Sequence, residues 1–359
     1  MEYFFSDVLE IKNGKNQKGV ENPEGRYPIY GSGGVMGYAD NYICEADTVI
    51  IGRKGNINNP IYVSEPFWNV DTAFGLSANK EVLLPRYLFY FCEKFDFNKL
   101  NKTVTIPSLT KADLLKIKMN LPNIKEQQHI VEKLIKLESI LKYRRQELST
   151  LDNLIKARFV EMFGEPRINP NKYPTKMIKD TCIVITGNTP SRKVDEYYGD
   201  AIEWIKTDNI VSGLLYPTVA SESLSDSGKA VGRTVDAGAI LMACIAGSVA
   251  SIGRVCITDR EVAFNQQINA IVPKEYDVRF LHALLQISKD YLVEDINMAL
   301  KGIMSKSKLE EKEFIVPSME EQVGFAEFAE QVDKSKVAVQ KALDETQLLF
   351  DSLMQEYFG

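Results

Sequence analysis

Histidine and cysteine are scarce in this chain. Only two histidines occur among its 359 residues, and neither has a Cys or an acidic residue at metal-ligand spacing: His129 and His282. The five cysteines are far apart, form no C-x-x-C pair and are odd in number: Cys44, Cys92, Cys182, Cys244 and Cys256. This usage fits reduced thiols in a cytosol better than a disulfide framework or a zinc site. Metal and histidine-based catalysis therefore have almost no material here.

Long apolar runs and nucleotide motifs are also missing. No window approaches 18 consecutive apolar residues, and the N-terminus (MEYFFSDVLE) has no basic region followed by an apolar stretch, so we expect neither a membrane span nor a secretory signal. The chain has no G-x-x-x-x-G-K-[ST] loop. YGSGGVMGY (30–38) has the wrong glycine spacing for a dinucleotide motif and is expected to be a flexible turn. INPN (168–171) lacks the aromatic residue of an N-P-P-[YF] amino-methyltransferase site. We expect a cytoplasmic protein without catalytic residues.

The overall composition is that of an ordinary globular protein. Hydrophobic residues make up 45% and charged residues 26%, and the length suggests about two domains. The net charge of −6 does not indicate a nucleic-acid-binding protein. Any nucleic-acid footprint must therefore be a local face.

An internal repeat organises the chain. LPNIKEQ (121–127) recurs as VPSMEEQ (316–322), an offset of 195, and the same offset maps 108–111 onto 303–306 and MFG (162–164) onto YFG (357–359). It also maps Gly52 onto Gly247 and Ile57 onto Ile252. Such dispersed matches predict two copies of one unit without a net insertion between these landmarks.

Each copy ends in a predicted long helix that begins at a capping box. Asn123 with Glu126, and Ser318 with Glu321, have the spacing in which cap and third helical residue bond reciprocally. About 40 residues without proline follow in each copy, ending near Gly164 and Gly359. At 1.5 Å per residue, such a helix spans roughly 60 Å and is suited to act as a spacer.

The apolar spacing of the two helices predicts a coiled coil. Alternate steps of four and three from Ile130 to Met162, and the same positions 195 residues later, are apolar at eight of ten places in each helix. Residues 124–164 carry 8 Lys and Arg against 6 Asp and Glu, whereas 318–359 carry 3 against 9, so opposite charge favours pairing of the two helices. The alternative is that each helix packs separately on its own globular domain.

The segments before the helices are expected to be mixed α+β modules. Short apolar runs predict strands at 48–51, 239–245 and 268–272, and short helices are expected at 84–93 and 278–286. Glycine- and asparagine-rich turns separate these elements. The predicted domains are 1–122, 123–164 (spacer helix), 165–317 and 318–359 (spacer helix).

Polar loops follow the predicted strands in both modules. They include NGKNQK (13–18), GRKGNINN (52–59), TGNTPSRK (186–193) and the Asn265–Gln267 group. NKTVTIPSLTK (101–111) corresponds to ALKGIMSKSK (299–308). Arg and Lys suit guanine edges and phosphates, and Asn and Gln suit adenine, so these loops could read bases; any solvated turn also contains such residues.

Taken together, these motifs resemble the specificity subunit of Type I DNA restriction–modification systems over essentially the whole chain. The resemblance rests on LPNIKEQ and VPSMEEQ, each closing a module, on the long helices ending near F-G, and on TGNTPSRK followed by EWIKTDNI (203–210) and NQQINAIVP (265–273). The first module departs from the pattern, because NGKNQK lacks the T-G-x-T-P-S form and GRKGNINN differs from AGSVASIG (246–253).

The resemblance implies an α+β fold with two similar target-recognition domains in a pseudo-twofold repeat, separated by two long antiparallel coiled-coil helices. It implies a non-catalytic subunit that reads a bipartite target in double-stranded DNA. Two adenine methyltransferase subunits, using S-adenosylmethionine, would dock on it, and motor-nuclease subunits using ATP and Mg would add restriction. The alternative is a coiled-coil scaffold that binds protein partners without reading DNA; a complete methyltransferase or nuclease is disfavoured by the missing motifs.

From the loops and the resemblance together we predict DNA contacts at several positions of both modules. These residues are Lys15, Lys18, Arg53, Lys54, Asn56, Asn58, Lys102, Lys111, Thr186, Asn188, Ser191, Arg192, Lys193, Ser248, Asn265, Gln266, Gln267, Lys301 and Lys306.

Overall fold

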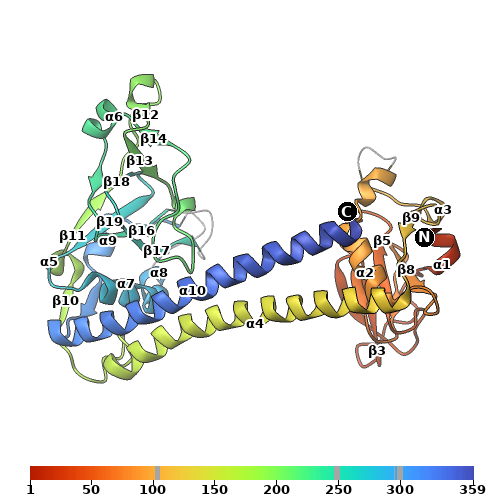
Figure 1. Ribbon diagram of the computed structural model, residues 1–359. Coiled ribbons are helices and arrows are strands. Elements are labelled where there is room, and N and C mark those ends of the chain that lie inside the picture. Colours follow the sequence, from red (N-terminus) through yellow and green to blue (C-terminus); the bar gives the residue numbers. More distant parts are fainter. Residues whose placement is uncertain (102–105, 246–250, 295, 297–301) are drawn as a thin grey trace. The chain divides into compact units, whose positions relative to one another are not determined.

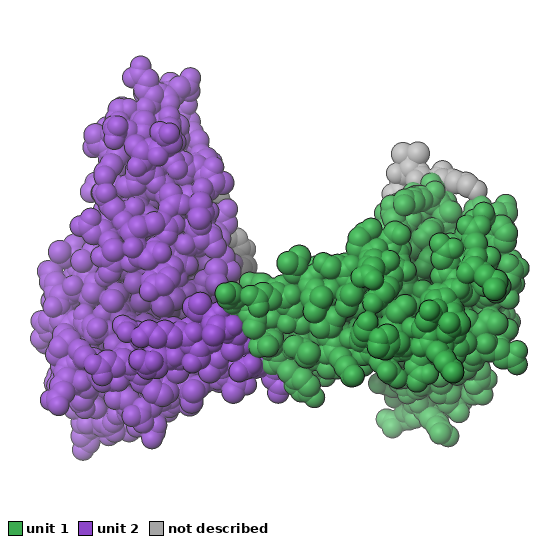
Figure 2. All heavy atoms as spheres, in the orientation of Figure 1, with its two compact units in different colours: residues 1–145, 341–359 green, residues 146–340 purple. Residues whose placement is uncertain are grey.

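The computed structural model describes residues 1–101, 106–245, 251–294, 296 and 302–359 (Figure 1). The chain forms two compact units, unit 1 (residues 1–145 and 341–359) and unit 2 (146–340), which Figure 2 colours separately. The two long helices, α4 (Ile124–Phe163) and α10 (Met319–Phe358), each contribute one end to each unit. Within the described ranges, no helix is both long and apolar enough to cross a membrane.

Unit 1 is built around a four-stranded sheet in the order β2-β8-β5-β6, next to a three-stranded sheet β4-β3-β7 and the pair β1-β9. Its strands are β1 (Glu2–Phe4), β2 (Leu9–Asn13), β3 (Tyr27–Gly31), β4 (Gly34–Ala39), β5 (Thr48–Gly52), β6 (Ile61–Val63), β7 (Trp68–Asn69), β8 (Ala73–Ala78) and β9 (Lys118–Asn120). Its shorter helices are α1 (Phe5–Val8), α2 (Pro85–Lys94), η1 (Phe97–Leu100) and α3 (Lys111–Leu114).

Unit 2 repeats the four-stranded arrangement as β11-β19-β16-β17 and adds a five-stranded sheet β12-β14-β13-β18-β15 and the pair β10-β20. Its strands are β10 (Thr175–Met177), β11 (Cys182–Thr186), β12 (Tyr198–Gly199), β13 (Ile202–Ile205), β14 (Ser223–Leu224), β15 (Thr234–Val235), β16 (Ile240–Ala243), β17 (Val255–Ile257), β18 (Val262–Phe264), β19 (Ile268–Pro273) and β20 (Glu313–Ile315). Its shorter helices are α5 (Ile178–Thr181), η2 (Asp195–Tyr197), η3 (Thr207–Asn209), α6 (Asp226–Val231), α7 (Val278–Ile287), α8 (Lys289–Val293) and α9 (Lys306–Glu310).

Most predicted elements are confirmed with small shifts of their ends. The expected strands correspond to β5, β16 and β19, and the expected short helices to α2 and α7. The flexible turn expected at 30–38 is wrong, because β3 and β4 form a hairpin whose pairing continues to Gly31 and Gly34. Gly34 has a φ of 118°, which glycine adopts without strain, so the glycine-rich sequence serves a tight hairpin.

The repeat is confirmed, but its offset is not constant. Leu9 pairs with Ala78 and Cys182 pairs with Pro273, so β2 and β11 are 173 residues apart while β8 and β19 are 195 apart. Unit 2 therefore carries 22 additional residues between these strands. The match of Gly52 with Gly247 is wrong, because Gly52 pairs with Ala73 and its counterpart opposite Ile268 is Ala243.

Both long helices begin at capping boxes. The Asn123 amide donates to the Glu126 carboxylate at 3.3 Å, and the Glu126 amide donates to Asn123 Oδ1 at 3.0 Å. The Ser318 and Glu321 pair makes the same two bonds at 3.0 and 3.3 Å. Each box satisfies two backbone donors that the first helical turn would otherwise leave without partners. After α4, Gly164 turns the chain with a φ of 76°.

The seam predicted from the heptad pattern is confirmed, since all twenty of its positions are buried or half-buried. In unit 2, Phe163 packs on Phe325 with ring centres 5.9 Å apart, while Lys336 Nζ bonds Asp152 Oδ1 at 2.6 Å. Residue numbers fall along α4 as they rise along α10, so the helices run antiparallel. In unit 1, Leu134 of α4 and Met354 of α10 share one core, and the alternative of separately packed helices is wrong.

Candidate nucleic-acid interface

The polar loops of unit 1 gather at one end of its four-stranded sheet. The chain leaves β2 at Asn13 and β5 at Gly52 and enters β8 at Ala73, all at this end. The Arg53 amide donates to the Thr72 carbonyl at 2.8 Å, the Leu109 amide donates to the Arg53 carbonyl at 2.9 Å, and the Lys15 amide donates to the Asn69 carbonyl at 2.8 Å. Residues 13–18, 52–59, 69–72 and 106–111 thus form one set, the first loop cluster.

Unit 2 assembles the equivalent set with the same backbone bonds. The Cys244 amide donates to the Gln267 carbonyl at 2.8 Å, the Met304 amide donates to the Cys244 carbonyl at 2.9 Å, and the Gly187 amide donates to the Ile268 carbonyl at 3.0 Å. Thr72 and Gln267, and Leu109 and Met304, are each 195 residues apart. Residues 186–193, 244–245, 251–254, 265–267 and 303–306 form the second loop cluster.

One glycine in each cluster is required by close packing. A Cβ on Gly14 would lie 1.8 Å from the Val70 carbonyl oxygen, and a Cβ on Gly187 would lie 2.2 Å from the Asn265 carbonyl oxygen. No side chain tolerates such distances, so only glycine lets the first loop cross the loop before β8 or β19. The same crossing at equivalent positions shows that both clusters use one backbone frame.

Several predicted contact residues of unit 1 are exposed in the first loop cluster. Lys15, Lys18, Arg53 and Lys54 are exposed, and within the described ranges none of them pairs with a carboxylate. The Arg53 guanidinium lies 5.8 Å from the centre of the Phe74 ring. These cations carry uncompensated charge on a unit that has no overall excess of base, which is the local footprint that phosphate binding requires.

Other predicted residues of unit 1 use their polar groups internally. Asn58 Nδ2 donates to Asp96 at 3.1 Å, and Asn58 Oδ1 accepts from the Phe97 amide at 2.7 Å. Lys111 Nζ donates to the Ile11 carbonyl at 2.6 Å. Asn56 is exposed, with one long bond of 3.5 Å to the Ser32 carbonyl. Asn58 and Lys111 therefore hold neighbouring elements in place.

In unit 2 the prediction for Asn265 needs correction. Asn265 is only 6% exposed, its Oδ1 accepts from the Gln267 amide at 3.0 Å, and its Nδ2 donates to Gln267 Oε1 at 3.2 Å. A buried amide with both groups occupied shapes the turn and does not present its edge to a base. Gln266 remains exposed, and the Thr189 hydroxyl donates to it.

Residues at the start of the second loop cluster divide in the same way. Asn188 brackets its loop, because its Nδ2 donates to the Val231 carbonyl at 2.9 Å and its Oδ1 accepts from the Arg233 amide at 2.8 Å. Thr186 Oγ1 donates to Asn269 at 2.8 Å. Ser191, Arg192 and Lys193 are exposed, as is Lys306, which pairs with Glu310 at 3.5 Å. The predicted Lys102, Ser248 and Lys301 lie outside the described residues.

Arg192 belongs to a cluster that the sequence did not reveal. Its guanidinium lies 4.3 Å from the Tyr198 ring centre and 5.1 Å from the Trp204 ring centre, and its Nη2 is 2.6 Å from Glu222. Glu222 also pairs with Lys206. Lys206, and then Arg192, hold the pKa of the Glu222 carboxyl below its usual value, so the carboxylate stays charged at neutral pH.

The glutamine of each L/V-P-x-x-x-E-Q motif has a structural role that sequence reasoning also missed. Gln127 is fully buried; its Oε1 accepts from the Leu84 amide at 2.9 Å, and its Nε2 donates to the Val82 and Pro122 carbonyls at 2.8 and 3.0 Å. Gln322 makes the matching bonds in unit 2. Each glutamine thereby ties the start of a long helix to the loop before α2 or α7.

Among the residues that the structure describes, no group of three or more His, Cys, Asp or Glu side chains could hold a metal ion. All five cysteines are free and buried, and burial raises the pKa of Cys44 and Cys182 to about 11. These thiols remain protonated at neutral pH, and they behave as core side chains.

Solved structures resemble the whole chain in fold. A crystal structure of a Type I restriction–modification S subunit from M. genitalium covers 100% of this chain and 96% of its own, with a TM-score of 0.64 and 14% identity. A chain from a structural study of complex assembly and conformational transition of the type I R-M system has a TM-score of 0.62 at 16% identity, covering 100% and 97%. At such identities the likeness concerns the fold alone.

Curated relatives match part of the sequence. The MjaIX Type I restriction enzyme specificity subunit of Methanocaldococcus jannaschii is 32% identical over 178 residues, 47% of this chain and 40% of the relative. The HindI specificity subunit of Haemophilus influenzae is 29% identical over 157 residues, 42% and 33% of the two chains. The match thus spans less than half the length of either relative.

The family model of the Type I restriction modification DNA specificity domain matches twice, at residues 1–151 and 170–346. These two matches together cover most of the chain, and each includes one of the two loop clusters. The chain therefore belongs to the family of Type I restriction modification DNA specificity domains.

Proposed function

We propose that this chain is the non-catalytic specificity subunit of a Type I restriction–modification complex and that it reads a bipartite target in double-stranded DNA. The observation that carries the proposal is the pair of loop clusters, held by equivalent backbone bonds in two copies of one fold. Each cluster exposes cations: Lys15, Arg53 and Lys54 in one, and Arg192 and Lys193 in the other. Phosphate contacts from such residues would position each unit, and neighbouring polar side chains would read bases.

Two reading units on one chain explain how a long sequence could be specified. One small unit distinguishes only a few base pairs, at about 1–3 kcal/mol for each mismatch. Linking a second unit makes its binding intramolecular, so the two specificities combine. We assign the spacing between the half-sites to α4 and α10, whose 40 residues each correspond to roughly 60 Å of helix.

The partners follow from this assignment. We propose that two adenine methyltransferase subunits, carrying S-adenosylmethionine, dock on the chain and modify one adenine in each half-site. Motor-nuclease subunits, using ATP and Mg, would add restriction. The chemistry then belongs to the partners, and this chain supplies the choice of sequence.

A methylome comparison tests the proposal. DNA from a strain with the gene should contain one bipartite adenine-methylated motif that is absent after deletion of the gene, and complementation should restore it. The same motif present in both strains would refute the proposal. A protein-interaction scaffold, the competing possibility suggested by the net charge of −6, predicts partner binding that is indifferent to a duplex of the mapped target.

A heptad deletion tests the role of the helices. Removing seven residues from the middle of α4 and the matching seven from α10 keeps the seam in phase. The number of unspecified bases between the half-sites should change while both half-site sequences stay the same. A changed half-site sequence with an unchanged gap would contradict this role.

A further inference from the structure

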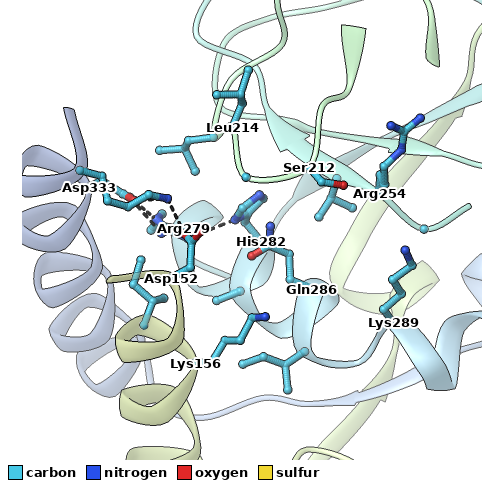
Figure 3. Close-up of a pocket in the computed structure, with 18 residues that line it drawn as sticks. Asp152, Lys156, Ser212, Leu214, Arg254, Arg279, His282, Gln286, Lys289 and Asp333 are labelled. Atoms are coloured by element: carbon cyan, nitrogen blue, oxygen red, sulfur yellow. Dashed lines mark hydrogen bonds and ion pairs between the residues drawn. The ribbon is translucent and has the colours of Figure 1, made fainter. Parts of the chain in front are cut away.

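A cavity of about 250 Å³ lies within unit 2 where α4, α7 and α10 meet the loops at 212–215 and 253–255 (Figure 3). We call it the basal pocket. Lys156 reaches it from α4, Gln286 from α7 and Arg254 from the end of the second loop cluster. None of these three side chains belongs to the residues predicted above to contact DNA.

The charges lining the basal pocket do not balance. Its two carboxylates are already engaged, because Asp333 accepts from Arg279 at 2.9 Å and Asp152 accepts from Lys336 at 2.6 Å. Within the described part of the chain, neither Lys156 nor Arg254 has a carboxylate partner. Arg254 is held by neutral groups, donating to the Ser251 and Thr207 carbonyls at 3.2 Å each. These bonds orient the guanidinium without neutralising its charge.

The floor of the pocket is polar and uncharged at its deepest titratable group. His282 is 2% exposed, and its Nδ1 accepts from Arg279 at 3.1 Å. Burial, and next the Arg279 charge, lower the pKa of His282 to about 3, so the ring is neutral at pH 7 and carries its hydrogen on Nε2. That Nε2 has no well-aligned hydrogen-bond partner. A buried donor beside two uncompensated cations favours an anionic ligand.

We propose that the basal pocket binds a phosphate group through Lys156 and Arg254, with Gln286 as an additional donor. This inference rests in part on the proposed function, since Arg254 belongs to the second loop cluster and a backbone phosphate of bound DNA is the expected source. A phosphate of a small nucleotide has the same chemistry and is the alternative source. A phosphate here would anchor unit 2 without reading sequence.

The test compares the full-length chain with Lys156→Gln and with the double variant Lys156→Gln/Arg254→Gln. Lys334→Gln is the control, because Lys334 is an exposed lysine of α10 outside the pocket. Duplex affinity is measured by fluorescence anisotropy between 50 and 300 mM KCl, with the mapped target and with a random duplex. Binding of inorganic phosphate is measured by titration calorimetry. Lys156→Gln guards against misfolding, since Lys156 is exposed and makes no structural bond.

A DNA phosphate predicts that the slope of log affinity against log salt becomes shallower by about 1 in Lys156→Gln, equally for both duplexes, and stays unchanged in Lys334→Gln. An unchanged slope together with lost inorganic phosphate binding would support the pocket and assign it to a small phosphate ligand. Unchanged slope and unchanged phosphate binding would overturn the inference. If the wild-type chain bound no duplex yet lost phosphate binding in the variants, the proposed function would fail while the pocket stood.

Discussion

Replacing Gln322 by Leu should destabilise unit 2 strongly, although Gln322 touches neither loop cluster. Gln322 is 1% exposed, and its amide makes three bonds: Nε2 donates to the Pro317 carbonyl at 2.9 Å and the Glu275 carbonyl at 3.3 Å, and Oε1 accepts from the Asp277 amide at 2.9 Å. At about 1 kcal/mol for each bond, the free energy of unfolding should fall by about 3 kcal/mol. The three backbone groups left without partners make this a lower estimate.

Urea denaturation followed by circular dichroism measures this loss, and hydrogen exchange locates it. The Asp277 amide should exchange about 100-fold faster in Gln322→Leu, because about 1.4 kcal/mol corresponds to a factor of ten. Gln331→Leu is the matched control on the same helix, since Gln331 is exposed and should change stability by less than about 0.5 kcal/mol. Equal effects of the two substitutions would show that the motif glutamine does not tie helix to loop.

The remaining predictions concern the loop clusters and the long helix. Gly187→Ala should destabilise unit 2 and weaken duplex binding, because its Cβ would lie 2.2 Å from the Asn265 oxygen, whereas Gly324→Ala, with nothing within 4 Å, should raise helix stability by about 0.5–1 kcal/mol; thermal denaturation of both checks the opposite signs. Glu222→Gln should release Arg192 and Lys206 and strengthen non-specific duplex binding at low salt, measured by anisotropy, and equal affinity would contradict a DNA-facing Arg192. Because the folded state lowers the Glu222 pKa, its pairing is complete above the ordinary value of 4.5 and is lost as the pH falls through the lowered value, so the difference between the two proteins should be constant from pH 6 to 8.

The long helices could be predicted because local rules decide them. Capping boxes at Asn123 and Ser318, the 3.5-residue apolar period and the Gly164 stop act over a few residues, and the structure has the helices where those signals occur. Buried apolar runs such as 268–272 became strands for the same reason. The outcome depended little on distant parts of the chain.

Features set by pairing between distant segments could not be read in this way. The shift of offset from 173 to 195 is visible only from strand register, because the additional residues of unit 2 have no sequence marker of their own. Asn265 has the side chain of a base-reading residue, but the turn with Gln267 buries it. The Arg192 cluster needs Tyr198, Trp204 and Glu222 from three different elements, and no spacing rule brings these together.

The two crossing glycines mark the borders of an exchangeable cassette. Between Gly14 and Ala73 in unit 1, and between Gly187 and Ile268 in unit 2, the chain differs in length by 22 residues, yet it enters and leaves the sheet at equivalent points. The capping boxes and buried glutamines lie outside these borders. New specificities could therefore arise by recombination at the two borders, with the helical frame inherited unchanged.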